Sequence, residues 1–317
     1  MYRLLINMCL AAGLLLSMPL FAEVDSSVKL SSENVELEWS VTDGCIRLSS
    51  VKIRGTDGWK ALELAKYQHR VLYSAEKPGT EPIAIYDTLG KEVVFPDPQY
   101  RYIIATWQQN NTAVALNRAG ENIVYVPQNF KKDGDAVVLC HEDGQMSVEE
   151  KWRIDTGGDI RVTMTLVAKQ DGYWSLTSPS LTVADKYDFQ WATVPGLYQG
   201  NEINHDYVRA LAYGQGIPDI PIVSKERSAS TLTSMITDKS GVTVAVTAEP
   251  GTARDPWEYD KKTHAVWKLG LSLMNRDGEF TPILYHPVLG EEGSFLKAGE
   301  SVSFSFRYTL RESDWYP

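Results

Sequence analysis

Alternation of apolar and polar residues is the feature that most limits the folds open to this chain of 317 residues. In stretches such as NVELEWSV (34–41), MSVEEKWRI (146–154) and VTVAVTA (242–248), the two kinds of residue mostly take turns. Successive side chains of a β-strand point to opposite faces, so this pattern predicts strands with one buried side. The same pattern predicts strands at 45–53, 101–108, 112–117, 136–140, 160–168, 173–183, 230–236, 264–274, 281–289 and 301–310.

Turn-forming pairs separate these segments at short intervals, for example Asp43-Gly44, Asp133-Gly134 and Asp277-Gly278. Asp-Gly pairs tolerate the left-handed backbone that tight hairpins need. No window shows a sustained helical period, and short helices are expected only near Trp59 to Leu64 and Asn204 to Leu211. Many short strands joined by tight turns predict an all-β fold, namely a large two-sheet antiparallel β-sandwich (supersandwich) with long irregular loops.

The first 22 residues have the composition of a secretory signal peptide. Arg3 supplies the positive start, Leu4 to Leu20 is mostly apolar, and Ala22 is a small residue at the cleavage position. A membrane anchor is the weaker alternative, because the apolar stretch is short and contains Pro19. We therefore expect removal of residues 1–22 and secretion of a β-domain, residues 23–317, to the periplasm or cell surface, with no later membrane span.

Charge and cysteine content limit the partners and the chemistry. Residues 1–22 hold one basic and no acidic residue, so the net charge of −10 becomes −11 once they are removed. An acidic protein repels nucleic acid and anionic lipid, so we expect no nucleic-acid partner. Cys45 and Cys140 then remain, and an oxidising compartment permits a disulfide between them. The sequence leaves open whether they are joined or free, because it does not give their separation.

Sequence motifs of common catalytic and cofactor sites are missing. The chain has no glycine-rich loop followed by Lys-Ser/Thr, no HExxH, no CxxC and no GxSxG. The histidines are isolated in the sequence and none has the spacing of a metal-ligand pair. We therefore predict no cofactor, no metal and no catalytic residue in this chain.

Two segments interrupt the alternation, about 190–228 and 249–262, and both are rich in Gly, Pro and aromatic residues. Long loops in compact domains are usually functional, and loops on a rigid sheet often carry binding sites. Aromatic rings pack on the C–H faces of sugars, while amide, carboxylate and guanidinium groups bond their hydroxyls. The candidate carbohydrate-binding residues are Trp191, Tyr198, Asn201, His205, Tyr213, Gln215, Arg227, Arg254, Asp255 and Trp257. The alternative is that these aromatics only fix the loops onto the sheet.

Two stretches, KWRIDTGGDIRVTMTLVAKQDGYWSLTSPSL (151–181) and PVLGEEGSFLKAGESVSFSFRYTLRESDWYP (287–317), resemble the galactose-mutarotase-like β-supersandwich. In particular they resemble the N-terminal domain of secreted bacterial six-hairpin glycoside hydrolases, and the resemblance extends from about Val35 to Pro317. In those enzymes an (α/α)6 domain follows and carries the catalytic acids. The resemblance implies a non-catalytic domain that shapes the cleft for an oligo- or polysaccharide, with a catalytic (α/α)6 domain after this chain in the native protein.

Other functions remain open at this point. A stand-alone glycan-binding protein is the main alternative, and a free mutarotase or polysaccharide lyase is less favoured. Mutarotases use a histidine pair and a glutamate, for which no matching motif is found here. The segment NEINHDYVR brings together Asn201, His205, Tyr207 and Arg209, the residue types that lyases use to move a proton from a uronate. Polarimetry on sugar anomers and ultraviolet absorbance on uronate polymers distinguish the two activities.

Overall fold

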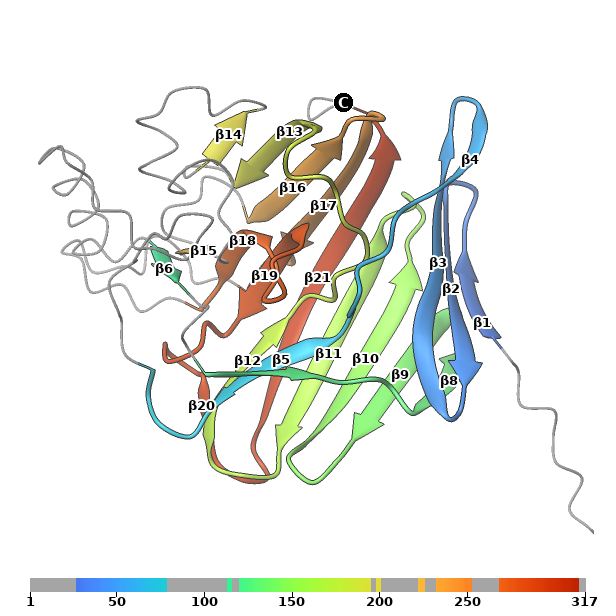
Figure 1. Cartoon of the computed structure of the whole chain (residues 1–317). Helices are drawn as coiled ribbons and strands as arrows, with labels where there is room; N and C mark the ends of the chain where they lie inside the picture. Colours follow the sequence, from blue (N-terminus) through green and yellow to red (C-terminus); the bar gives the residue numbers. More distant parts are fainter. Residues whose placement is uncertain are drawn as a thin grey trace, which may run out of the picture.

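The computed structural model describes residues 27–78, 113–115, 120–194, 198–200, 222–225, 232–252 and 268–313. Within these residues all regular elements are β-strands (Figure 1). They form antiparallel sheets of four, nine and eight strands. The all-β class predicted from the alternation is confirmed.

The nine-stranded sheet is the larger layer, with the strand order β14-β13-β16-β17-β21-β11-β10-β9-β8. Three of its strands, β10, β11 and β17, have the bounds predicted from the alternation. In chain order its strands are β8 (Asn129–Asp133), β9 (Ala136–Glu142), β10 (Met146–Ile154), β11 (Ile160–Ala168), β13 (Phe189–Val194), β14 (Tyr198–Gly200), β16 (Thr233–Asp238), β17 (Val242–Ala248) and β21 (Ser301–Glu312).

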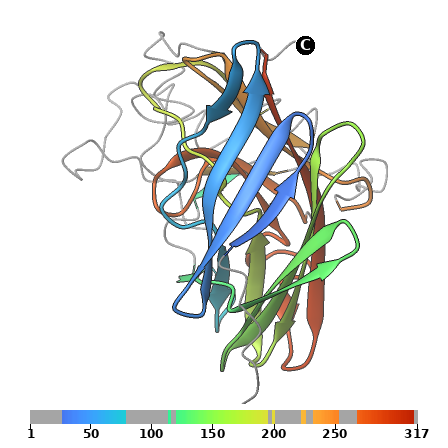
Figure 2. The same ribbon diagram turned by 90° about the vertical axis from the view of Figure 1, so that its right-hand side faces the viewer.

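The second layer is divided into two sheets that lie on one face of the nine-stranded sheet (Figures 1 and 2). The four-stranded sheet has the order β1-β2-β3-β4 and faces β8 to β10; its strands are β1 (Ser27–Ser31), β2 (Val35–Thr42), β3 (Cys45–Gly55) and β4 (Gly58–Ala61). The eight-stranded sheet has the order β6-β15-β18-β19-β12-β5-β7, with β20 beside β12. Its strands are β5 (Arg70–Ser74), β6 (Ala113–Ala115), β7 (Glu121–Val124), β12 (Gly172–Thr177), β15 (Ile222–Lys225), β18 (Gly270–Met274), β19 (Phe280–His286) and β20 (Phe295–Leu296).

The buried core lies between the two layers and joins all three sheets. Trp39 of β2 meets Trp152 of β10 edge to face, with ring centroids 5.5 Å apart, and Tyr308 of β21 stacks on Trp152 at 6.2 Å. Burial of large apolar side chains of this kind is the main stabilising contribution to a sandwich. The face of the nine-stranded sheet turned away from this core is called the outer face below.

Tight turns form where glycine patterns predict them. Asp43 and Gly44 both have positive φ, at 53° and 70°, and connect β2 to β3 in a two-residue hairpin. This is the backbone of the hairpin turn that Asp-Gly favours. The turn fixes the register of the hairpin, in which Thr42 lies opposite Cys45.

Two local predictions need correction. The helix expected near Trp59 to Leu64 is wrong, because residues 58–61 form β4, which pairs with β3. Gly55 and Gly58 lie opposite each other where the tight turn joins the two strands. The prediction that the chain is irregular from about residue 190 is also wrong for its first residues. Residues 189–194 form β13, whose backbone pairs with β16 across a register shift. The helix expected near Asn204 to Leu211 and the strand at 101–108 lie outside the described residues.

Cys45 and Cys140 are both free thiols and both are half-buried. Burial raises the pKa of the Cys140 thiol, and the nearby Glu149 carboxylate adds to the effect. In the part of the chain that the structure describes, no helix is long and apolar enough to cross a membrane.

Candidate ligand-binding site

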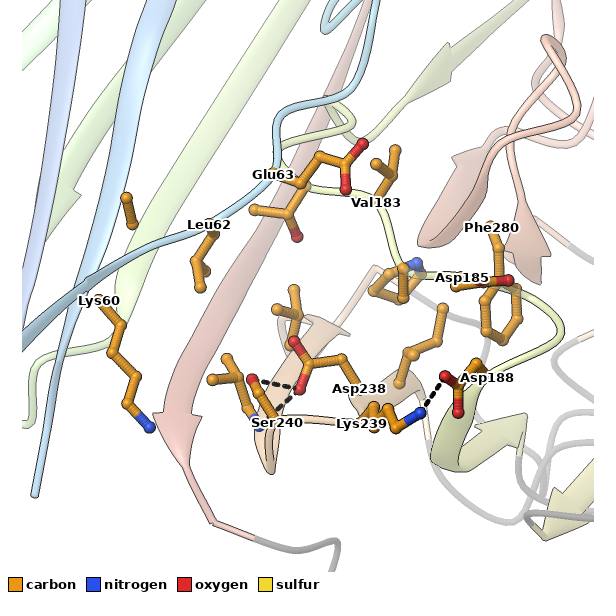
Figure 3. Close-up of a pocket in the computed structure, with 17 residues that line it drawn as sticks. Lys60, Leu62, Glu63, Val183, Asp185, Asp188, Asp238, Lys239, Ser240 and Phe280 are labelled. Carbon is orange, nitrogen blue, oxygen red and sulfur yellow. Dashed lines mark hydrogen bonds and ion pairs between the residues drawn. The ribbon is translucent and has the colours of Figure 1, made fainter.

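A pocket of about 600 Å³ is lined by residues from, or next to, all three sheets. Figure 3 shows the residues that line it. Four pieces of chain form it: the end of β4 with the residues after it, the connection that follows β12, the β16–β17 hairpin and the start of β19. The β4 end comes from the four-stranded sheet, the hairpin from the nine-stranded sheet and β19 from the eight-stranded sheet. The pocket therefore depends on the packing of both layers.

Apolar side chains form the inner part of this pocket. They come from all three sheets, since Leu62 follows β4, Ile236 and Val244 belong to β16 and β17, and Phe280 and Pro282 belong to β19. Phe280 is itself held by Phe189, with ring centroids 5.0 Å apart. The apolar part is thus continuous with the core and has a fixed shape.

Charged and polar groups surround the apolar part. In Figure 3, Lys60 lies on one side of the pocket and Asp188 and Lys239 on the other, with Asp238 and Ser240 between them. Asp238 Oδ1 accepts hydrogen bonds from Ser240 Oγ at 2.8 Å and from the Val242 backbone amide at 2.9 Å, which shapes the β16–β17 turn.

Two ion pairs fix the lysines of the pocket. Lys239 pairs with Asp188 and so connects the β16–β17 turn to the 182–188 connection. Lys60 pairs with Glu312 at the end of β21, and this hydrogen bond raises the pKa of the lysine. Both ammonium groups thus have a carboxylate partner, although the Lys239–Asp188 pair is largely exposed to solvent.

Two polar groups on the pocket wall remain available to a ligand. The Glu63 carboxylate and the Thr182 hydroxyl make no side-chain hydrogen bond to any other residue that the structure describes. A pocket that combines apolar side chains with uncommitted polar groups can hold a small molecule. The arrangement suits a ligand with both an apolar face and hydroxyl groups.

Of the carbohydrate-binding residues predicted from sequence, only Trp191 has a described side chain. Tyr198 lies on strand β14, which is described for its backbone alone. The remaining candidates lie outside the described residues: Asn201, His205, Tyr213, Gln215, Arg227, Arg254, Asp255 and Trp257.

Trp191 sits on β13 and not on a loop, directly opposite Thr237 of β16. Its neighbour Ala192 is fully buried in the core, so Trp191 points to the outer face, away from the pocket. The ring is half-buried and its Nε1 donates to Thr193 Oγ1 at 2.9 Å. The structure therefore does not bring Trp191 together with the pocket residues.

The pocket residues were missed by sequence reasoning. Their only sequence signal is two short charged turns, ADKYD (184–188) and TDKSG (237–241), which look like ordinary connections. Only strand pairing and the packing of the layers bring the two turns within contact of each other.

Metal binding has no support in the described ranges, where no group of three or more His, Cys, Asp or Glu side chains is placed to hold an ion. Near Gly134 and Gly144, Asp133 pairs with Lys151 at 2.6 Å, and Asp143 Oδ2 lies 3.1 Å from His141 Nε2.

The chain matches no protein-family model and no curated protein sequence. Among solved structures it is similar to an aldose epimerase homologue from C. elegans, with 8% identity, 91% of this chain and 99% of that chain covered, and a TM-score of 0.43. It is also similar to galactose 1-epimerase from Lactobacillus acidophilus, with 10% identity and a TM-score of 0.37. The match covers 90% of this chain and 98% of the epimerase.

A heparan sulfate lyase from Pedobacter heparinus is similar with 8% identity over 90% of this chain, but over only 34% of the lyase, with a TM-score of 0.33. The structures found thus include epimerases of the mutarotase-like fold that the sequence resembles. At these identities and TM-scores, no activity, ligand or residue role passes from them to this chain.

Proposed function

We propose that this chain is a secreted carbohydrate-binding β-supersandwich and that the pocket between its three sheets is the sugar site. The observation that carries the proposal is the combination of a fixed apolar wall with uncommitted polar groups in a pocket of about 600 Å³. This volume lies within the range of about 300 to 1,000 Å³ found for ligand sites. Sugars offer apolar C–H faces together with hydroxyls, and so match both parts of the wall.

Closing the pocket tests this proposal. Ser240 is exposed in the turn at the pocket edge, so a Ser240→Trp variant places a large ring there while the core stays intact. We expect binding of neutral oligosaccharides, measured by titration calorimetry against a panel of plant and bacterial glycans, to weaken at least about tenfold. Thermal unfolding of the variant should stay close to that of the unchanged protein, since exposed turn positions contribute little to stability.

Ser240→Ala is the matched control. It removes the same hydroxyl, and with it the hydrogen bond to Asp238, but adds no bulk. Binding that survives in Ser240→Ala and is lost in Ser240→Trp supports the pocket as the sugar site. Equal binding by both variants contradicts it.

We propose further that the domain belongs to a glycoside hydrolase and is itself non-catalytic, shaping the substrate cleft of a following (α/α)6 domain. The support is the sequence resemblance in 151–181 and 287–317. The intact mass of the native product, detected in its source cells with an antibody against this chain, tests it. A product far above 35.5 kDa supports a following domain. A product slightly below that mass favours the stand-alone glycan-binding protein, and hydrolysis by the mature chain alone contradicts the non-catalytic role.

A further inference from the structure

The outer face of the nine-stranded sheet carries a row of arginines. In the strand register, Arg153 of β10 lies opposite Arg161 of β11, and Arg161 lies opposite Arg307 of β21. Residues directly opposite on adjacent antiparallel strands have side chains on the same face about 5 Å apart. Three guanidinium-bearing side chains therefore start from neighbouring points of one surface.

Such a row is unfavourable unless the charges are balanced, because like charges directly opposite each other destabilise a sheet. Arg161 forms two ion pairs, one with Asp155 at 2.9 Å and one with Glu249 at 2.5 Å. Arg307 is balanced less well, since its closest carboxylate, Asp159, lies 3.8 Å away and also pairs with Arg311 at 3.5 Å.

Arg153 is not balanced at all within the described part of the chain. Its side chain is exposed and makes no ion pair or hydrogen bond with another described residue. The row therefore ends in a free guanidinium on a protein whose net charge is −10. Excess positive charge on one face of an acidic protein attracts anionic ligands locally.

The free guanidinium lines a hollow of about 350 Å³ on this face. Lys151, Arg153 and Arg161 are the cations of its lining. Lys151 is paired with Asp133, and Arg161 with Asp155 and Glu249, so Arg153 is the one that has no carboxylate partner among the described residues. Thr163 and Ser305 add hydroxyl groups, whose oxygens lie 3.0 Å apart. The hollow thus combines the one unpaired positive charge of Arg153 with neutral hydrogen-bonding groups.

We propose that this hollow and the arginine row bind an acidic polysaccharide through its carboxylate or sulfate groups. Arginine is suited to both groups, because its planar fork bonds their oxygens in pairs. Neighbouring strands are about 4.8 Å apart, so the row from Arg153 to Arg307 extends about 10 Å and contacts more than one anionic group of a chain. The anionic ligand follows from the arginines, whereas the choice of a polysaccharide rests on the proposed function. This surface is separate from the pocket between the sheets, whose lining shares no residue with it.

Binding of defined polyanions to the full chain tests the site. The probes are dextran sulfate for sulfate, polygalacturonate for carboxylate, uncharged dextran and single-stranded DNA of similar length. We expect saturable binding to at least one acidic polysaccharide, none to dextran, and a fall in affinity with rising salt. In Arg153→Gln, affinity for that polysaccharide should fall about tenfold, as expected for the loss of a charge-assisted contact.

Arg47→Gln is the matched control. Arg47 is an exposed arginine of β3 in the four-stranded sheet, with no described ion partner, so the substitution changes the net charge equally but at a distant surface. It should leave affinity within about twofold of the unchanged protein. An equal loss in both variants, or no binding of either acidic polysaccharide, overturns the proposal.

Two further measurements distinguish this site from a general polyanion site and from the pocket between the sheets. Binding of DNA as tight as that of the polysaccharides overturns the assignment to polysaccharide. The Ser240→Trp variant should keep its affinity for the acidic polysaccharide, because its change lies in the pocket between the sheets. Loss of acidic-polysaccharide binding in that variant overturns the separate site, whereas loss of neutral-glycan binding alone bears only on the proposed function.

Discussion

Replacing Glu150 with glutamine is expected to destabilise the protein by about 3 kcal/mol or more, because it breaks a buried charged network. Glu150 is 1% exposed on β10, on the core face of the nine-stranded sheet. Its Oε1 accepts from Tyr125 OH at 2.5 Å and lies 2.8 Å from His69 Nδ1, and its Oε2 accepts from Trp152 Nε1 at 2.9 Å. The carboxylate thus connects the segments beside β5 and β7 to the opposite layer.

Glutamine cannot replace this carboxylate. The glutamine amide has a single acceptor oxygen, whereas Glu150 uses both of its oxygens. The NH₂ group would replace one of them and point its hydrogens at Trp152 Nε1 or at the Tyr125 and His69 side. A buried donor left without an acceptor costs about 1 to 3 kcal/mol, and removal of one partner of a buried ion pair costs about 3 to 5 kcal/mol. Urea unfolding at pH 7, analysed for midpoint and slope, measures the change.

Glu149→Gln is the matched control for this experiment. Glu149 is the preceding residue on the same strand, but its side chain is 52% exposed on the outer face and pairs with Lys131 at 3.5 Å. Exposed pairs of this kind contribute about 0 to 1 kcal/mol. Similar small losses in the two variants would contradict a stabilising role for the buried network.

The network also has an expected pH dependence. Burial alone would raise the pKa of Glu150, but the charge of His69 and the hydrogen bonds from His69, Tyr125 and Trp152 outweigh it, and the pKa is lowered from 4.5. A carboxyl with a lowered pKa in the folded state stabilises the protein above its unfolded pKa. This contribution is present above pH 4.5 and is lost as the pH falls through the folded pKa.

Acidification from pH 7 to pH 5 is expected to remove about 2 kcal/mol of stability through His286 alone. His286 of β19 is 8% exposed and stacks on Phe304, with ring centroids 5.1 Å apart. Burial, with a smaller effect from the charge of Lys268, lowers the pKa of His286 from 6.5 to about 4. Its Nδ1 is buried and has no hydrogen-bond partner within the described ranges.

The sign of this effect follows from proton binding. Between pH 6.5 and about 4 the unfolded chain binds a proton at this histidine and the folded protein does not. Folding is therefore weakened as the pH falls through this window, and the full loss of about 3 kcal/mol is reached near the folded pKa. The window lies above the range in which Glu150 acts, so a comparison of pH 7 with pH 5 leaves out the contribution of Glu150.

A His286→Gln variant separates this residue from the other histidines, which are common to both proteins. Glutamine is uncharged at every pH, so the variant should lose about 2 kcal/mol less than the unchanged protein between pH 7 and pH 5. Urea unfolding at the two pH values gives the four free energies needed. The same pH dependence in both proteins would show that His286 is not the responsible group.

The sequence by itself determined most of the strands that have one buried face, although β1, whose burial also alternates, was not predicted. In β10, alternation places Val148, Glu150 and Trp152 on one side, so even the buried position of the carboxylate follows from the pattern. The Asp43-Gly44 turn was equally predictable, because few residue pairs tolerate its backbone. Strands without alternation were missed: β5 is buried over its first three residues, and the edge strand β8 is almost wholly exposed.

Only the tertiary structure decided which residues meet. The strand register places Arg153, Arg161 and Arg307 in one row, and a slip of one residue would turn any of them to the opposite face. Glu150 gains His69 and Tyr125 from segments far away in the chain, and the pocket gains its walls from three different sheets. Such contacts depend on pairing and layer packing between distant segments, and local alternation carries no information about either.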